Sequence, residues 1–124
     1  MSYISKFVST ITIDSTATTT GYIPSDGAFI NGRIINVLHF ASTIPFTSNA
    51  DVVMTVEGTS QTVLNLVNGS TGSWVYAPRQ NIHSTTGGST ANVQEPFVVF
   101  NDRIKVNITA AATSTVGTFW VLVE

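Results

Sequence analysis

The chain has 124 residues, a formal net charge of −2 and no cysteine, and only 10% of its side chains are charged. This length allows one domain with a real hydrophobic core but not two. The composition excludes disulfides and thiolate metal sites, and its few, scattered Lys and Arg residues exclude a phosphate-binding patch, so we expect no nucleic-acid partner. No segment has the ~20 apolar residues of a transmembrane helix, and the N-terminus does not resemble a signal peptide, so we expect no membrane association.

Short runs of Val, Ile, Thr and aromatic residues predict β-strands along the whole chain. The first run, 7–13, alternates apolar and polar side chains, and a turn-rich segment around Pro24 follows it. The run 33–40 is apolar on both faces, which is typical of a central strand in a two-layer structure. Further strands are predicted at 50–58, 61–68, 73–79, 96–100, 103–109 and 117–124.

Two segments interrupt the strand pattern. Pro45 breaks it within 42–49, and 80–95 has no useful periodicity and contains a Gly-Gly pair, which predicts a mobile surface loop. The last two predicted strands are joined by a linker of small residues, so we expect them to form a hairpin within one sheet. About eight short strands and no convincing helix predict an all-β fold: a single-domain antiparallel β-sandwich, for which a jelly roll is one candidate form.

No residue cluster in the sequence resembles an active site. His39 lies in a buried-looking strand and His83 in a polar loop, with no carboxylates at the spacing of metal ligands. Asp51 and Glu57 share a strand face, but six residues of strand separate them by roughly 20 Å. That distance is too long for the carboxylate pair of a glycosidase. We therefore predict that the protein is not an enzyme and has no catalytic, cofactor-binding or metal-binding residues.

Exposed apolar and aromatic side chains are the remaining candidates for binding. Trp74 and Tyr76 share one face of a predicted strand and form the best candidate for an aromatic patch. Ile44 and Phe46 lie on a loop that no strand pattern requires to be buried, although packing into the chain's own core stays open as an alternative. Arg79 stands where a strand ends and the second loop begins. The predicted partner-binding residues are Ile44, Phe46, Trp74, Tyr76, Arg79 and His83.

Five segments resemble, by their order and spacing, a family of small virion proteins of tailed bacteriophages. They are "NGRIINVLHF", "ADVVMTVEGTSQTVL", "YAPRQNIH", "NDRIKVNI" and "GTFWVLVE". No single segment is specific, and the resemblance covers roughly residues 32–124. Ser60 departs from the family pattern, because the corresponding turn more often carries glycine.

The resemblance implies a structural virion protein, best described as a capsid cement or decoration protein. Such a protein is made in the bacterial cytoplasm and binds and stabilises the lattice of the major capsid protein on the capsid surface. Residues 32–124 would form the β-sandwich body. Residues 1–31 would form an N-terminal strand and arm, which either reaches a neighbouring subunit or pairs within its own sandwich.

The low charge of the chain independently suits a protein that lives in an assembly, because few charges oppose association. We expect a homo-oligomer, either a dimer or a trimer, that attaches through apolar and backbone contacts centred on 42–49 and 81–95. A receptor- or carbohydrate-binding virion module, and a head–tail or tail component, remain the alternatives.

Overall fold

The computed structural model describes residues 3–14, 16–47, 49–68, 72–83 and 86–124. These residues form eleven strands and no α-helix, and therefore no helical segment that could cross a membrane. The prediction of an all-β antiparallel sandwich is confirmed. The strands are β1 (Ser5–Thr12), β2 (Thr19–Ile23), β3 (Ile30–Ala41), β4 (Asp51–Val56), β5 (Thr62–Leu66), β6 (Trp74–Tyr76), β7 (Arg79–His83), β8 (Ser89–Pro96), β9 (Val98–Asp102), β10 (Ile104–Thr109) and β11 (Val116–Val123).

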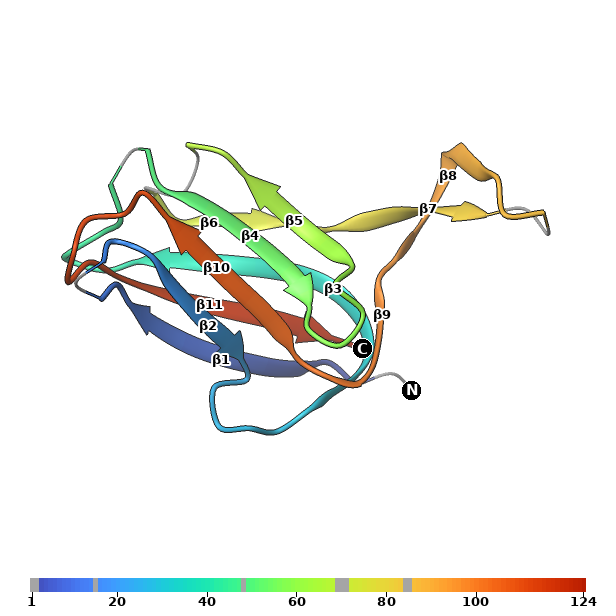
Figure 1. Ribbon diagram of the computed structural model, residues 1–124. Coiled ribbons are helices and arrows are strands. Elements are labelled where there is room, and N and C mark those ends of the chain that lie inside the picture. The colour runs from blue at the N-terminus through green and yellow to red at the C-terminus, as the bar shows by residue number, and fades with distance from the viewer. Residues whose placement is uncertain (1–2, 15, 48, 69–71, 84–85) are drawn as a thin grey trace.

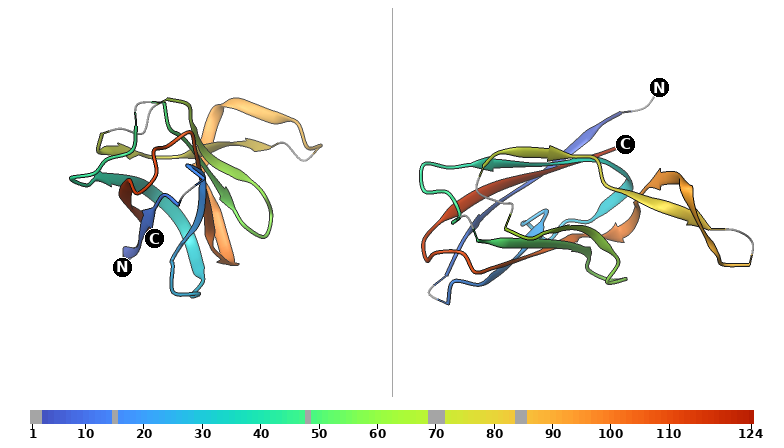
Figure 2. Two further views of the ribbon diagram at one scale, coloured as in Figure 1. Left: turned by 60° about the vertical axis from the view of Figure 1, so that its left-hand side comes forward. Right: turned by 90° about the horizontal axis from the view of Figure 1, so that it is seen from above.

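Two antiparallel sheets face each other across one core (Figures 1 and 2). Sheet A has the order β1-β11-β3-β6, and sheet B has the order β2-β10-β4-β5. The chain passes from one sheet to the other between β1 and β2, β2 and β3, β3 and β4, β5 and β6, β9 and β10, and β10 and β11. This is the strand order of an eight-stranded jelly roll. The strands β7, β8 and β9 are inserted between β6 and β10, and β9 returns to pair with the first residues of β3.

The last two strands do not form the expected hairpin. β10 pairs with β2 and β4, whereas β11 pairs with β1 and β3 in the opposite sheet. The predicted alternation itself is confirmed, because Ile104 and Val106 in β10 and Phe119 and Val121 in β11 are all buried. A period of two identifies the face of a strand that meets the core, but it does not identify the neighbouring strand. The connection between β10 and β11 therefore crosses between the sheets.

β3 is central, as predicted, but its two faces do not follow a simple alternation. Ile34 is buried, and so are Val37 and His39 further along the strand. The ladder between β3 and β11 shifts register between Leu122 and Val123, which places one additional residue in β3 at that point. This bulge moves the inward positions from even to odd residues. Ile34 therefore faces the core, whereas Leu38, opposite Trp120, lies on the outward side of the strand.

The N-terminal strand is an integral part of the sandwich. β1 pairs with β11 of the same chain along its whole length, from Ser5 opposite Val123 to Thr12 opposite Val116. Of the two alternatives given above for the N-terminal strand, β1 therefore follows the one in which it pairs within its own sandwich. A contact of residues 1–31 with a neighbouring subunit remains a prediction.

The segment 80–95 was expected to be a loop, but most of it belongs to a β-hairpin. β7 and β8 pair with each other, with Arg79 opposite Pro96 and Gln80 opposite Glu95, and residues 84–85 lie outside the described part. The hairpin projects from the sandwich (Figures 1 and 2). A hairpin that covers no core needs no apolar face, so its polar sequence carries no alternation. That is why the sequence pattern did not predict it.

Candidate interaction surfaces

The outward face of sheet A carries a continuous row of apolar side chains across four strands. Val8 of β1 lies opposite Trp120 of β11, Trp120 lies opposite Leu38 of β3, and Leu38 lies opposite Val75 of β6. Val75 is 60% exposed, and Val8 is exposed as well. Phe40 and Leu122 flank this row on the same side of the sheet. We call these residues the outer apolar face: Val8, Leu38, Phe40, Val75, Trp120 and Leu122.

Trp120 is at the centre of the outer apolar face. Its ring lies 4.7 Å from the ring of Phe40, measured between centroids, and the Nζ atom of Lys6 lies 4.2 Å from the ring centroid on the indole. Lys6 is the one charged side chain among the described outward residues of the rows beside Trp120, and it covers the indole through a cation–π contact. The centre of this face is therefore apolar, and its one neighbouring charge, that of Lys6, is in contact with Trp120.

The outward face of sheet B provides the contrast. The corresponding row across its four strands reads Thr20, Asn107, Val53 and Asn65. In a two-layer sandwich the outward sides of the strands are ordinarily polar, because they meet water. Sheet B follows this rule and sheet A does not. Of the two outward sheet faces, the outer apolar face is therefore the one that exposes apolar area to water and would be stabilised more by a partner.

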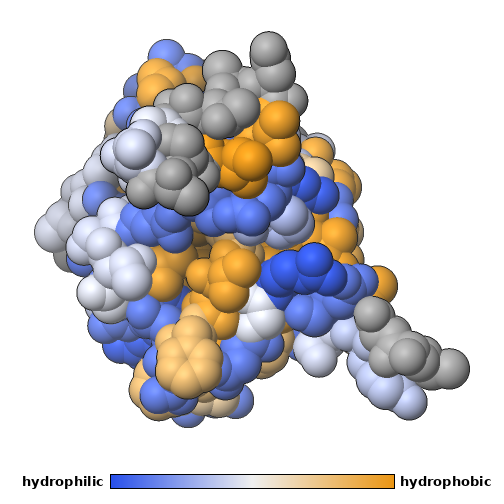
Figure 3. Space-filling model, turned by 90° about the vertical axis from the view of Figure 1, so that its right-hand side faces the viewer, coloured by the Kyte–Doolittle hydropathy of each residue, from blue (hydrophilic) through white to orange (hydrophobic). Residues whose placement is uncertain are grey.

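The projecting hairpin is held to the body near its base. The Nη1 atom of Arg79 donates a hydrogen bond to the carbonyl oxygen of Ile35 at 3.2 Å, and Nε2 of Gln61 donates to Oε1 of Gln80 at 2.7 Å. Figure 3 views the end of the molecule from which the hairpin projects, where apolar and polar areas are mixed. A two-stranded ribbon is marginally stable by itself in water, so a partner surface would stabilise this one.

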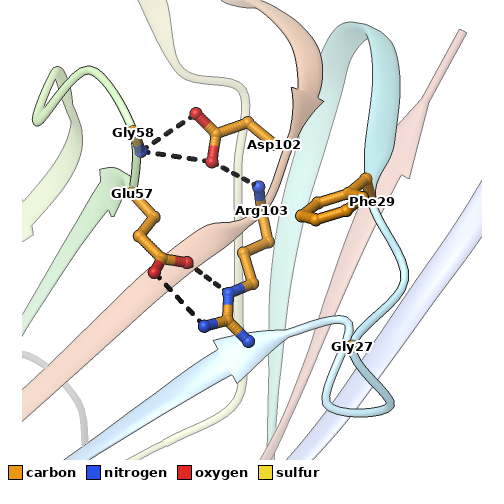
Figure 4. A pocket seen from close by; sticks show the side chains of 6 residues that line it. All are labelled: Gly27, Phe29, Glu57, Gly58, Asp102 and Arg103. Atoms are coloured by element: carbon orange, nitrogen blue, oxygen red, sulfur yellow. Dashed lines mark hydrogen bonds and ion pairs between the residues drawn. The ribbon is translucent and has the colours of Figure 1, made fainter.

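A hollow of about 500 Å³ lies between the β4–β5 turn and the β9–β10 turn, with Gly27 and Phe29 of the β2–β3 connection also in its wall (Figure 4). The guanidinium of Arg103 forms an ion pair with Glu57 through Nε and Nη2, and it lies 3.7 Å above the ring of Tyr22. Hydrogen bonding to Arg103 lowers the pKa of Glu57 below its ordinary value of 4.5. Asp102 accepts the backbone N–H of Gly58 at 2.9 Å and that of Arg103 at 2.8 Å. These charged groups are paired with one another and with backbone N–H groups, so they hold the two turns together.

The most polar part of the core is built around His39, which is buried among Phe46, Trp74 and Phe119. Its Nδ1–H donates to the carbonyl oxygen of Gly72 at 2.8 Å, so Nε2 is the unprotonated nitrogen. Burial lowers the pKa of His39 from 6.5, and the hydrogen bond to Gly72 partly opposes this shift. Nε2 of His39 and Nε1 of Trp74 are both buried without a hydrogen-bond partner among the described residues.

The structure corrects two of the predicted binding residues. Phe46 is only 2% exposed and stacks on His39, so it is a core residue and not a surface anchor. Trp74 and Tyr76 do share a face, with ring centroids 5.2 Å apart, but that face points inward, opposite Val37 and His39. Trp74 packs against the core, whereas Tyr76 stays partly exposed at the edge of the sheet. The pair is therefore not an outward aromatic patch.

The other predicted residues are distributed over separate parts of the molecule. Ile44 is 55% exposed, as expected. Arg79 is exposed and fixes the base of the hairpin. His83 ends β7, and its side chain lies outside the described part of the structure. Within the described ranges, no three His, Asp or Glu side chains come together as a metal site.

Comparison with solved structures gives a likeness in overall chain path. A solved structure described as the crystal structure of FLHE superposes with a TM-score of 0.47 and 9% sequence identity, covering 99% of each chain. No protein-family model matches the chain, and no curated protein matches it.

The outer apolar face was not predicted from the sequence, although one signal for it was present. The run "TFWVLV" in β11 is apolar at both odd and even positions, so it predicts an apolar side on each face of the strand. Only one of these sides is needed for the core. The other places Trp120 and Leu122 outward, where they meet Leu38, Phe40 and Val8 from neighbouring strands.

Proposed function

We propose that the protein is a structural component of a tailed-bacteriophage particle, a capsid decoration protein that attaches to the lattice of the major capsid protein. The resemblance of residues 32–124 to small virion proteins supports the proposal that the protein is part of a bacteriophage particle. The projecting hairpin is the observation that carries the proposal of attachment, since it extends away from a complete jelly roll and none of its described residues belongs to the buried core.

The hairpin suits attachment for two physical reasons. In the part of the chain that the structure describes, β7 and β8 pair only with each other, so each strand has one edge that could extend a partner's sheet. Its described side chains include the neutral polar Asn81 and Gln94, which are hydrogen-bonded to each other at 3.1 Å. Attachment of this kind depends little on charge, in agreement with the low charge of the chain.

The fold is compatible with this proposal but does not distinguish it from the alternatives. Jelly rolls occur in viral capsid proteins and in lectins, and a fold does not define a function. The pair expected to serve a receptor- or carbohydrate-binding virion module, Trp74 with Tyr76, does not form an outward platform, because Trp74 packs against the core. A head–tail or tail component differs from a decoration protein in its copy number.

A shortened hairpin tests the proposal directly. Gln80 and Glu95 lie opposite each other, so residues 81–94 are replaced by Asn-Gly, which closes a two-residue turn. Arg79 and Gln80 remain, and with them the bonds that hold the base of the hairpin. We expect this variant to keep the melting temperature of the parent protein and to lose binding to particles produced without the protein, measured by co-sedimentation.

Copy number in purified particles provides the second measurement. A decoration protein is expected at a copy number comparable with that of the major capsid protein, whereas a connector or receptor-binding protein is present in far fewer copies. Undiminished particle binding by the shortened variant, or absence of the protein from purified particles, would contradict the proposal.

A further inference from the structure

We propose that the outer apolar face binds the same face of a second copy of this chain, forming a two-fold symmetric dimer. The contact stacks one sheet A on the other, with Trp120 at its centre. This inference concerns the isolated protein and does not depend on attachment to a virion. It rests on the composition, charge and dimensions of the outer apolar face.

The register of the strands makes this face continuous. Val8, Trp120, Leu38 and Val75 are direct cross-strand neighbours, so their side chains form one row that runs from β1 to β6. Phe40 extends the apolar surface beside Trp120. A broad sheet face packs best on another sheet face, about 10 Å away and with the strands roughly aligned. A second copy supplies such a face with the same apolar composition.

The charges on this face favour a second copy over a charged partner. A two-fold contact brings a surface onto itself, so any charge at its centre would meet the same charge. The central row has no charged side chain, and the ammonium group of Lys6 at its side is already engaged with Trp120. By contrast, the outward face of sheet B carries Lys105 between β2 and β4, within a row that is otherwise polar. Sheet A is therefore the face suited to self-association.

The dimensions of the face predict a weak dimer. Four strands at ~4.8 Å spacing and the five residues 118–122 at ~3.3 Å each give a projected area of roughly 300 Å² per copy. Stable interfaces bury about 800 Å² per partner, and weak, transient ones bury less. We therefore expect a dimer that dissociates at micromolar concentrations and forms when the local concentration is high, as it is in an assembly.

The test is sedimentation equilibrium of the purified chain over a wide concentration range, from about 5 μM to about 1 mM, which brackets weak association. The parent protein is expected to rise from the monomer mass of 13.2 kDa toward twice that value. The double variant Val8→Lys/Val75→Lys places new charges in the contact at two exposed positions and is expected to weaken association at least tenfold. Circular dichroism and thermal melting verify that the variant is folded.

A matched control separates this face from general surface stickiness. Val67 is 68% exposed and follows β5 of sheet B, so Val67→Lys, compared with the single variant Val75→Lys, adds the same charge outside the outer apolar face. Its association is expected to equal that of the parent protein. Three results would overturn the inference: a parent protein that stays monomeric at the highest concentration, a dimer that persists in the double variant, or a dimer that Val67→Lys disrupts equally.

Since dimerisation is measured without particles, its failure is distinguishable from the failure of attachment through the hairpin. A monomeric protein that still binds particles would leave the proposed function intact and refute the dimer. A dimer that does not bind particles would support the dimer and refute the proposed function.

Discussion

The imidazole of His39 stacks on the ring of Phe46, with ring centroids 5.4 Å apart and planes inclined by only 9°. This pair joins β3 to the loop that follows it, and Trp74 and Phe119 enclose it from β6 and β11. A titratable group is thereby placed inside an aromatic cluster. The stability of the protein should consequently respond to pH in a range where most proteins are insensitive.

We predict that the protein loses stability as the pH falls below about 6.5. Burial lowers the pKa of His39 in the folded state below the ordinary value of 6.5. Between these two pKa values the unfolded chain binds a proton that the folded chain does not, so the free energy of unfolding decreases as the pH falls. One such proton contributes a slope of at most about 1.4 kcal/mol per pH unit. Urea unfolding at several pH values from 7.5 to 5.5 measures this slope.

His39→Asn is the variant that identifies the source of the slope, because its side chain does not titrate and keeps an N–H donor near the position of Nδ1. It is expected to be less stable than the parent protein at pH 7.5 but to show a smaller decrease toward pH 5.5. His83→Asn removes the second histidine and controls for it. An unchanged slope in His39→Asn would refute the assignment.

We predict that Gly117→Ala destabilises the protein although it adds only one methyl group. A Cβ atom at Gly117 would lie 2.5 Å from Nε2 of His39 and 2.7 Å from the ring of Phe46. Both rings are buried and stacked, so neither can move away freely. Overpacking of this kind costs about 1–3 kcal/mol. Gly72→Ala, where a Cβ would meet nothing within 4 Å, is the matched control and is expected to have a much smaller effect.

We predict that Ser60→Gly stabilises the β4–β5 turn. Ser60 has a φ of +59°, in the left-handed region that favours glycine. Its N–H donates to the carbonyl oxygen of Val56 at 2.8 Å, which fixes this conformation. The strain relieved is about 1–2 kcal/mol, and the greater freedom of glycine in the unfolded chain offsets part of it. Denaturant midpoints should therefore rise in Ser60→Gly and fall in Thr59→Gly, where φ is not positive.

The sequence predicted the sandwich because the core-facing residues alternate clearly. Val52, Met54 and Val56 in β4 point inward as expected, and the same holds for the apolar positions of β10. The sheet partners could not be predicted, since alternation gives the face of each strand and not its neighbour. β2 was missed because its Thr-rich sequence resembles a flexible connection, although its register with β10 buries Ile23.

The binding residues were predicted less well for a related reason. Exposure of an apolar loop residue depends on the path of the loop, and the path of 42–49 turns Phe46 into the core while Ile44 stays outside. The face of Trp74 depended on the partner of β6, which the sequence did not reveal. The outer apolar face needs four strands from distant parts of the chain to be recognised at all.

The contrast between Ile44 and Phe46 gives the final prediction, which concerns attachment to particles. Phe46→Ser is expected to cost about 3–5 kcal/mol or more, as large-to-small changes of buried aromatic residues do, so its loss of binding would only report unfolding. Ile44→Ser changes an exposed side chain and is expected to alter stability by no more than about 0.5 kcal/mol. If the loop 42–49 contributes to attachment, Ile44→Ser lowers particle occupancy at an unchanged melting temperature.

Exposed ion pairs contribute only about 0–1 kcal/mol each, so occupancy of the parent protein should also change little across a salt series. Full occupancy of Ile44→Ser, together with binding that collapses between low and moderate salt, would show that charge and not apolar contact holds the protein on its partner.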